Sequence, residues 1–548
     1  MQKAAADLSG KRAGSCREID SSWYMEFYSL QFIFFISFWL VLYYGSGRLF
    51  KARKWVVLLG ASLSFYAILE WKGVFFLLAT AGTTWLSAGL LDVLRDSCRE
   101  ERKKLTDRKE KAAVKSSFQK KRRRVLVLCL LLNFGILALL KYTGDILKDI
   151  SGWKSLLIPV GISFYTFQSI SYLIDVYNEK YESEKNFWKY LLFVSWFPQL
   201  LEGPINRYDA MKSSLFQDHD WDSQRSYEAL LLILYGLFKK YVIAEQLSPL
   251  ISQMFDQVDV NIPGAVVVCG ILMYSAQQYA DFSGGIDIVL GVSRLFGVSM
   301  AQNFRQPYFA TSLGDFWRRW HISLGAWMRD YVFYPLALLP GMQRLGKWFV
   351  KRFPGKWGKH LGRIVPACLA NIVVFVIVGI WHGAQEHYLA WGLYNGLVIA
   401  ASDLLRPLFV SAAEHAPFSV SERCAHILRV IRTFLIVNIG WYFDRIEDFG
   451  YRMICFRNTI CHFELSRLKP TLYSYNLDYV MKPVGIAVLG ILVVLAVSLM
   501  SENHIDVRGR LMKMPAWVQA GVLTAAMVMI LFAFVFTAPS GGFLYAQF

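Results

Sequence analysis

The dominant pattern along the chain is a series of apolar stretches, each about as long as a bilayer requires. A membrane-spanning helix needs roughly 20 apolar residues, because each residue rises about 1.5 Å. Stretches of this kind predict helices near 27–45, 55–69, 73–94, 125–141, 155–177, 187–203, 228–247, 263–280, 364–382, 387–405, 428–443, 483–500 and 516–538. Shorter apolar pieces at 284–300 and 322–340 indicate re-entrant or interfacial segments. The pattern therefore predicts an all-α polytopic membrane protein.

Composition agrees with this class and limits how the charge is interpreted. Of the 548 residues, 55% are hydrophobic and only 18% are charged, whereas soluble domains carry about 25% charged residues. The net charge is +18, and its densest cluster is the segment 95–124, between two apolar stretches. Basic loops of this kind mark the cytoplasmic side of a membrane and contact anionic lipid. We therefore expect a cytoplasmic loop and a lipid contact here, and no nucleic-acid partner.

The two ends of the chain follow from the same topology. With 95–124 inside, both termini are predicted to be extracytoplasmic. Residues 1–24 form a polar tail without the order of a cleavable signal, and an alternative translation start at Met25 would remove this basic tail from the unfavoured side. Residues 25–538 form the membrane domain. Residues 539–548 form a short mobile tail, in which Tyr545 could also be an interfacial aromatic anchor.

The eight cysteines are scattered, with no CxxC and no Cys/His ligand spacing, so no metal site is predicted. Cys455 and Cys461 lie in a segment predicted to be outside. A bridge between them is one alternative there, and a reduced pair is the one we expect.

Ionisable residues interrupt the apolar pattern between 281 and 396, the motif core of the chain. His321 and His382 lie there, and a charge near the bilayer centre costs roughly 2.5–3.5 kcal/mol, so such groups normally face a wet cavity. Histidine can also take and return a proton near neutral pH, as a general base must. Two simpler interpretations stay open: His382 could bond a carbonyl of the next helix, and FWRRWH could be an interfacial segment.

Two further stretches border this core. SWFPQLLEGPINRY places Glu202, Asn206 and Arg207 directly after an apolar run that Pro198 breaks, although an ordinary interfacial cap explains the same pattern. QQYADFSGGIDIVLG brings Asp281 to the edge of the core, beside a glycine pair that we expect to be flexible.

These motifs resemble the membrane-bound O-acyltransferase family. The similarity lies in QQYADFSG, in NFRQPYFATSLGDFWRRWHISLGAWMRDYVFYPL and in VGIWHGAQEHYLAWGLYNG, and SWFPQLLEGPINRY and the terminal FLYAQF extend it. The nearest resemblance is to the bacterial branch that contains alginate O-acetyltransferase and teichoic acid D-alanyl-transfer proteins. WHG alone is a weak signal, whereas FWRRWH followed downstream by WHG is a specific one.

The resemblance implies a fold and a set of site residues. The fold is a ring of about 11–13 transmembrane and re-entrant helices around a thin centre, with a funnel and a tunnel that meet at the catalytic histidine. By position this residue is His382, and His321 is the second family histidine. A tyrosine near the C-terminus carries the acyl group, which points to Tyr545. Candidate contacts to the substrate or donor are Arg318, Arg319, Asp281, Trp381 and Asn395.

The resemblance also implies the reaction. An acyl group, for which we favour acetyl, would pass from a cytoplasmic thioester across a bacterial plasma membrane to hydroxyls of an extracytoplasmic polysaccharide, with His382 as general base. The donor would be acetyl-CoA or an acyl carrier-protein thioester, and no metal or permanently bound cofactor is implied. The expected partners are membrane lipid, a cell-surface polysaccharide, an extracytoplasmic esterase-like acyltransferase and, as an alternative, a carrier protein.

Two other functions remain as alternatives. D-alanyl transfer to teichoic acid is one, because Tyr334-Pro335-Leu336-Ala337 lacks the glycine pair of alginate-type members. A transporter or channel would also place histidines and arginines at membrane depth. We expect an internal repeat of hydropathy in that case, and each central motif occurs once.

Overall fold

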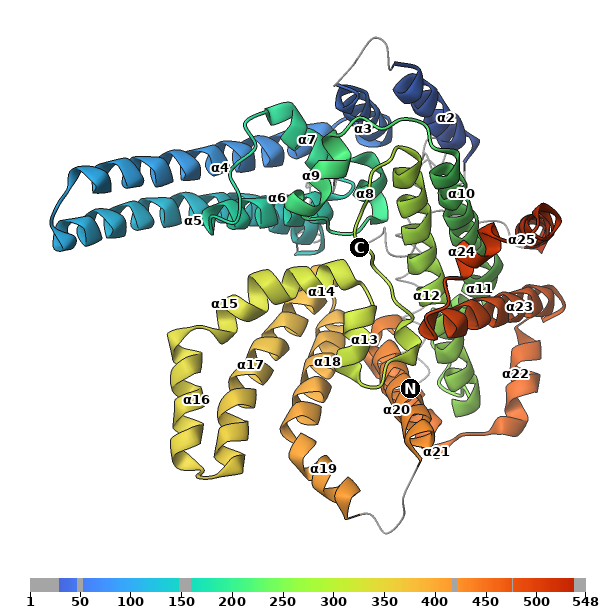
Figure 1. Ribbon diagram of the computed structural model, residues 1–548. Helices are drawn as coiled ribbons and strands as arrows, with labels where there is room; N and C mark the ends of the chain where they lie inside the picture. The colour runs from blue at the N-terminus through green and yellow to red at the C-terminus, as the bar shows by residue number, and fades with distance from the viewer. Residues whose placement is uncertain (1–28, 47–52, 147–158, 416–420, 476, 537–548) are drawn as a thin grey trace.

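The computed structural model describes residues 29–46, 53–146, 159–415, 421–475 and 477–536. Regular structure in these residues is entirely helical (Figure 1). Seven helical stretches are long and apolar enough to cross a membrane. They are α4 (Gly73–Lys104), α5 (Arg108–Ile146), α17 (Lys356–His382), α18 (Glu386–Leu404), α20 (Glu422–Arg445), α23 (Leu477–Glu502) and α25 (Ala516–Phe536). The prediction of an all-α polytopic membrane protein is confirmed.

The remaining helices surround these spans. The apolar α2 (Leu30–Gly45) and α3 (Trp55–Glu70) open the described chain. The others are α6 (Ile162–Tyr177), α7 (Phe187–Ser195), α8 (Phe197–Glu202), α9 (Tyr208–Phe216), α10 (Ser223–Phe238), η2 (Lys239–Ala244), α11 (Glu245–Phe255), α12 (Gly264–Leu295), η3 (Pro307–Phe309), α13 (Leu313–Arg319), α14 (Ile322–Met328), η4 (Arg329–Phe333), α15 (Tyr334–Ala337), α16 (Pro340–Arg352), α19 (Arg406–Glu414), α21 (Phe449–Cys461), η5 (Leu465–Arg467), α22 (Leu468–Ser474) and α24 (Val507–Met512).

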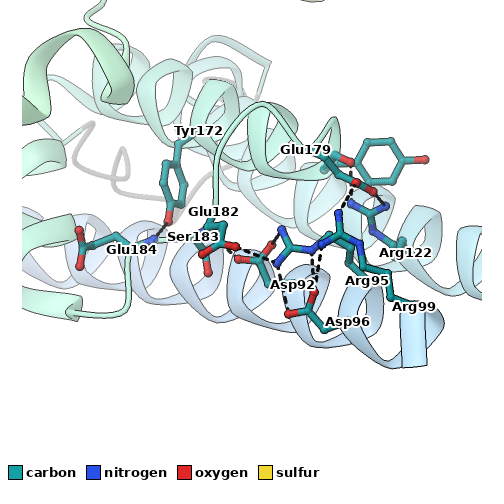
Figure 2. Close-up of polar contacts among 11 residues, drawn as sticks. Asp92, Arg95, Asp96, Arg99, Arg122, Tyr172, Glu179, Glu182, Ser183 and Glu184 are labelled. Carbon is teal, nitrogen blue, oxygen red and sulfur yellow. Dashed lines mark hydrogen bonds and ion pairs between the residues drawn. The ribbon is translucent and has the colours of Figure 1, made fainter. Parts of the chain in front are cut away.

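We expect a loop at 95–124, but most of this segment is helical. α4 continues to Lys104 and α5 begins at Arg108, so the two helices extend side by side as a long projection (Figure 1). Lys, Arg, Glu and Gln are good helix formers, which explains why a charged segment continues two apolar helices. Ion pairs fasten this projection to the chain after α6, such as Arg122 Nη1 to Glu179 Oε1 at 2.7 Å (Figure 2).

The predicted break between 263–280 and 284–300 is also wrong, because α12 runs unbroken through both. The glycine pair is a packing contact rather than a hinge. A Cβ on Gly284 would lie 2.9 Å from the carbonyl oxygen of Gly236 on α10, and a Cβ on Gly236 would lie 2.5 Å from that of Gly284. Small residues let two helices approach this closely within a membrane protein.

The structure keeps the other predicted interruptions. The segment 322–340 is divided among α14, η4, α15 and the start of α16, and the stretch 187–203 is broken between α7 and α8, next to Pro198. The predicted helix at 228–247 continues through the π-helical η2 into α11. Cys455 is buried, Cys461 is exposed, and both are free thiols, as we expected.

Candidate functional site

His321 and His382 line one cavity of about 370 Å³. Its lining along α17 extends from Asn371 to His382, which is about 16 Å at 1.5 Å per residue. Arg318 and Arg329 also line it, with side chains 70% and 58% exposed, and we call this part the basic end. Gln278 of α12 and Asp444 of α20 also line it, and we call their part the acidic end. The cavity thus joins two histidines to polar groups of opposite character.

His382 is the last residue of α17, and three helices fix its position. Gly379 and Gly392 bring α17 and α18 together, because a Cβ on Gly379 would lie 2.5 Å from the carbonyl oxygen of Tyr388. The imidazole ring then stacks on Tyr388, with ring centroids 5.8 Å apart. From α5, Tyr142 donates a hydrogen bond to the carbonyl of Ile380 at 2.6 Å, and the Lys141 ammonium donates one to the carbonyl of Trp381.

These two donors satisfy carbonyls that have no partner at a helix C-terminus, and the Lys141 charge is on the side that the helix dipole favours. The C-terminal end of α17 is therefore held by residues near the C-terminal end of α5, in addition to its contacts with α18.

His321 occupies a left-handed backbone conformation, with φ +45°, between α13 and α14. Its Nδ1 lies 3.1 Å from Asn303 Oδ1, which also accepts from the N–H of Ser323 at 3.1 Å and from its hydroxyl at 2.8 Å. An amide oxygen can only accept, so Nδ1 carries the hydrogen and Nε2 is the basic nitrogen of the ring. Burial lowers the pKa of His321 to about 3, so the ring is neutral at neutral pH.

The SWFPQLLEGPINRY stretch supports this histidine turn from behind. The N–H of Ile205 donates to Ser323 Oγ at 3.0 Å, and Asn206 Oδ1 accepts from the N–H of Ala301 at 2.9 Å. Arg207 instead pairs with Asp330 at 3.3 Å. This polar cluster therefore holds the segment 301–323 in place.

The predicted contact residues divide into three groups. Arg318 lines the cavity. Arg319 does not, because it forms ion pairs with Asp315 at 3.2 Å and Glu502 at 2.8 Å. Asn395 is also outside the lining, and its Oδ1 accepts from the indole N–H of Trp317 at 3.0 Å, which holds that lining residue in place.

Trp381 and Asp281 lie behind the cavity. The Trp381 ring is buried and lies 6.4 Å from that of His321, between centroids. Asp281 forms an ion pair with Lys240 at 2.6 Å, and Lys240 forms a second one with Glu245 at 2.8 Å. Tyr545, the predicted acyl carrier, lies outside the described residues.

Sequence reasoning missed several residues of the site. Asn303 lies inside one of the recognised motifs, but no periodicity marks it as the partner of His321. Asp444 follows directly after the predicted helix 428–443, so the criterion that found the histidines, an ionisable residue bordering an apolar stretch, would also have found it. Lys141 lies at the end of the predicted helix 125–141 and carries the same signal.

Comparisons with known proteins find a matching family profile and several relatives. The sequence profile of the membrane-bound O-acyltransferase family matches residues 183–349. The chain is 32% identical over 435 residues to a probable alginate O-acetylase of Pseudomonas aeruginosa, covering 77% of this chain and 72% of that protein. It is 27% identical to a peptidoglycan O-acetyltransferase of Helicobacter pylori, covering 77% of this chain and 82% of the relative. It is 26% identical to a teichoic acid D-alanyltransferase of Bacillus subtilis, covering 52% and 67%.

Proposed function

Because the chain belongs to the membrane-bound O-acyltransferase family, we propose that it transfers an acetyl group from a cytoplasmic thioester towards hydroxyls of an extracytoplasmic polysaccharide. That it is an acyltransferase follows from the family; the donor, the direction and the residue roles are the proposal. One observation carries it: a single cavity is lined by both histidines and by the exposed guanidinium groups of Arg318 and Arg329. Such groups bind the phosphates of a donor such as acetyl-CoA.

In the proposed reaction His382 is the general base. It takes the proton of the acceptor hydroxyl while that oxygen attacks the thioester carbonyl carbon. The carbon–sulfur bond then breaks, and the thiolate leaves with the proton that the imidazolium returns, so no net proton is consumed. His321 is neutral with Nε2 as its basic nitrogen, and it orients the hydroxyl as a hydrogen-bond acceptor. Developing charge on the carbonyl oxygen needs a donor in the same cavity.

An alternative acceptor stage, based on the family resemblance of FLYAQF, involves the C-terminal tail in place of direct transfer to a polysaccharide hydroxyl. Tyr545 would receive the acyl group and pass it to an outer-face, esterase-like partner. We expect Tyr545→Phe to block acylation of the polymer, while purified protein still consumes the thioester measurably by hydrolysis, with water as the acyl acceptor. Unchanged polymer acylation in the Tyr545→Phe strain would remove this residue from the mechanism.

A second acyl group, D-alanyl, is kept because of one local feature. The short α15, Tyr334–Ala337, lacks the glycine pair of alginate-type members, and a teichoic acid D-alanyltransferase is among the relatives. In that case the donor would be a carrier-protein thioester.

The test is mass spectrometry of the surface polymers from a wild-type strain and from a strain without this gene. We expect the wild-type polymer alone to carry the mass of one acetyl group per modified unit. The mass of an alanyl group would favour the alternative, and identical polymers in both strains would contradict both.

A further inference from the structure

The acidic end of the cavity has no role in the reaction described so far. We infer that Gln278 and Asp444 bind a second hydroxyl group of the acceptor, next to the hydroxyl that reacts, and so select polyol acceptors over simple alcohols. This inference depends on the proposed function and adds the substrate class that the cavity accepts.

Gln278 is held in one orientation by a fixed carboxylate. Asp444 Oδ2 accepts from the hydroxyl of Tyr274 at 2.6 Å and from Gln278 Nε2 at 3.2 Å. With its amide nitrogen committed to Asp444, Gln278 directs Oε1 elsewhere. Among the described residues no donor reaches this oxygen, although the side chain is only 3% exposed and lines the cavity.

A buried hydrogen-bond acceptor without a donor costs free energy, and a ligand with an O–H group can donate the missing hydrogen bond. Asp444 adds a second acceptor, because the hydrogen bonds it accepts from described residues all reach Oδ2. A phosphate or a thioester has no hydrogen to donate, and the carboxylate repels a phosphate. The donor therefore fits the basic end, and a hydroxyl-rich acceptor fits the acidic end.

Aromatic contacts place this subsite beside the histidines. The Trp441 ring, one helical turn before Asp444, lies 5.6 Å from the ring of Trp320, the residue that precedes His321. It also lies 6.2 Å from the ring of Tyr274, the partner of Asp444. A hydroxyl at Gln278 would thus leave a neighbouring hydroxyl of the same molecule within the part of the cavity that the histidines line.

The experiment uses the purified full-length protein, acetyl-CoA, and two alcohols of equal chain length, glycerol and 1-propanol. Ester products are quantified by mass spectrometry, and CoA release without alcohol reports the donor side. We expect wild type to favour glycerol by about tenfold in kcat/KM, since the loss of one hydrogen bond costs about that much. Gln278→Leu should bring the ratio close to one.

Asn438→Leu is the matched control. Asn438 is a buried amide on α20 whose Oδ1 also has no described donor, but it does not line the cavity. This variant should keep the wild-type ratio. Asp444→Asn tests the other occupant, an ammonium group of a D-alanyl donor: if it slows consumption of a D-alanyl thioester and leaves the alcohol ratio unchanged, the hydroxyl subsite is refuted.

An equal ratio in wild type, or a ratio that Gln278→Leu leaves intact, also overturns the subsite while ester formation itself upholds the proposed function. Failure of the proposed function is different: wild type would form no ester with either alcohol and release no CoA.

Discussion

Two regions of this protein bury ionisable groups, and they use them in opposite ways. In the first, Lys239 and Lys240 of η2 meet Asp281 and Asp287 of α12 and Glu245 of α11, with ion-pair distances between 2.6 and 2.8 Å. In the second, His321, His382, Gln278 and Asp444 border a cavity. α12 supplies residues to both regions.

The two regions differ in how completely their charged groups form ion pairs with one another. Each carboxylate in the lysine cluster has an ammonium partner, so the cluster joins three elements, and none of its residues lines the histidine cavity. The histidine cavity keeps acceptor and donor atoms facing a space. A charge in an apolar stretch therefore indicates a functional site only when it also borders a cavity. The sequence does not show cavities, so Asp281 and His382 look equivalent there, although only His382 lines the cavity.

The largest expected effect is on the cavity side of this comparison. His382→Ala should lower acyl transfer by about 10²–10⁴-fold, because the proposed general base is lost, while the free energy of unfolding stays within about 1 kcal/mol of wild type. The measurement is transfer of radiolabelled acetyl by the purified protein. His387→Ala, on α18 outside the cavity lining, is the control and should stay near wild type. Comparable loss in both variants would contradict the assignment of His382.

On the lysine side the effect should be on stability. Lys240→Met removes a cation that pairs with two buried carboxylates, and breaking a buried ion pair typically costs about 3–5 kcal/mol. We expect a lower unfolding temperature in detergent, with normal transfer per folded molecule. Combining it with Asp281→Leu and Glu245→Leu should recover much of the loss. If Lys240→Met abolished transfer at wild-type stability, the cluster would be part of the reaction rather than of the fold.

An intermediate effect is expected for Asn303, which holds His321 in place through hydrogen bonds instead of ion pairs. Asn303→Ala removes the oxygen that accepts from His321 and Ser323, and misplacing a reacting group by about 1 Å costs up to about 10²-fold. Transfer should fall by about 10–100-fold with little change in KM for the donor. Asn303→Asp keeps the acceptor oxygen and should restore part of the rate. Equal damage by both variants would indicate a general folding defect.

The smallest effect should come from a third cluster, in which the carboxylate is exposed and one of its two arginines is buried. Glu179 pairs with Arg122 and Arg99 at the base of the α4–α5 projection (Figure 2). Glu179→Gln should lower stability by about 1 kcal/mol or less, because exposed pairs are screened by water and salt. The unfolding temperature should be insensitive to the variant at high salt, and a larger loss would place this cluster with the buried one.

Hydrophobic patterning predicted most of the helices, because a span must be apolar over a fixed length. It failed where pattern and packing diverge. The sequence predicts flexibility at Gly284, whereas in the structure this residue packs closely against α10. The charge of the segment 95–124 predicts a loop, although its residues favour helix. The first error concerns a contact between parts of the chain that are distant in sequence, and the second concerns a local helix preference of charged residues.

The site was predictable to the extent that its residues stand out locally. His321, His382 and Arg318 do, and they line the cavity. Asn303 and Gln278 are ordinary residues in sequence, and their importance comes from what tertiary structure brings next to them. Asn395 and Trp381 show the converse, because motif residues can support a cavity without lining it.

The left-handed conformation at His321 has a practical consequence for anyone who engineers this enzyme. Glycine and asparagine adopt φ near +45° more readily than histidine, which pays a backbone cost of about 1 kcal/mol there. Libraries ranked by thermostability will thus be enriched in substitutions at this position that remove the imidazole to which we assign the orientation of the acceptor, so selection must assay acyl transfer itself.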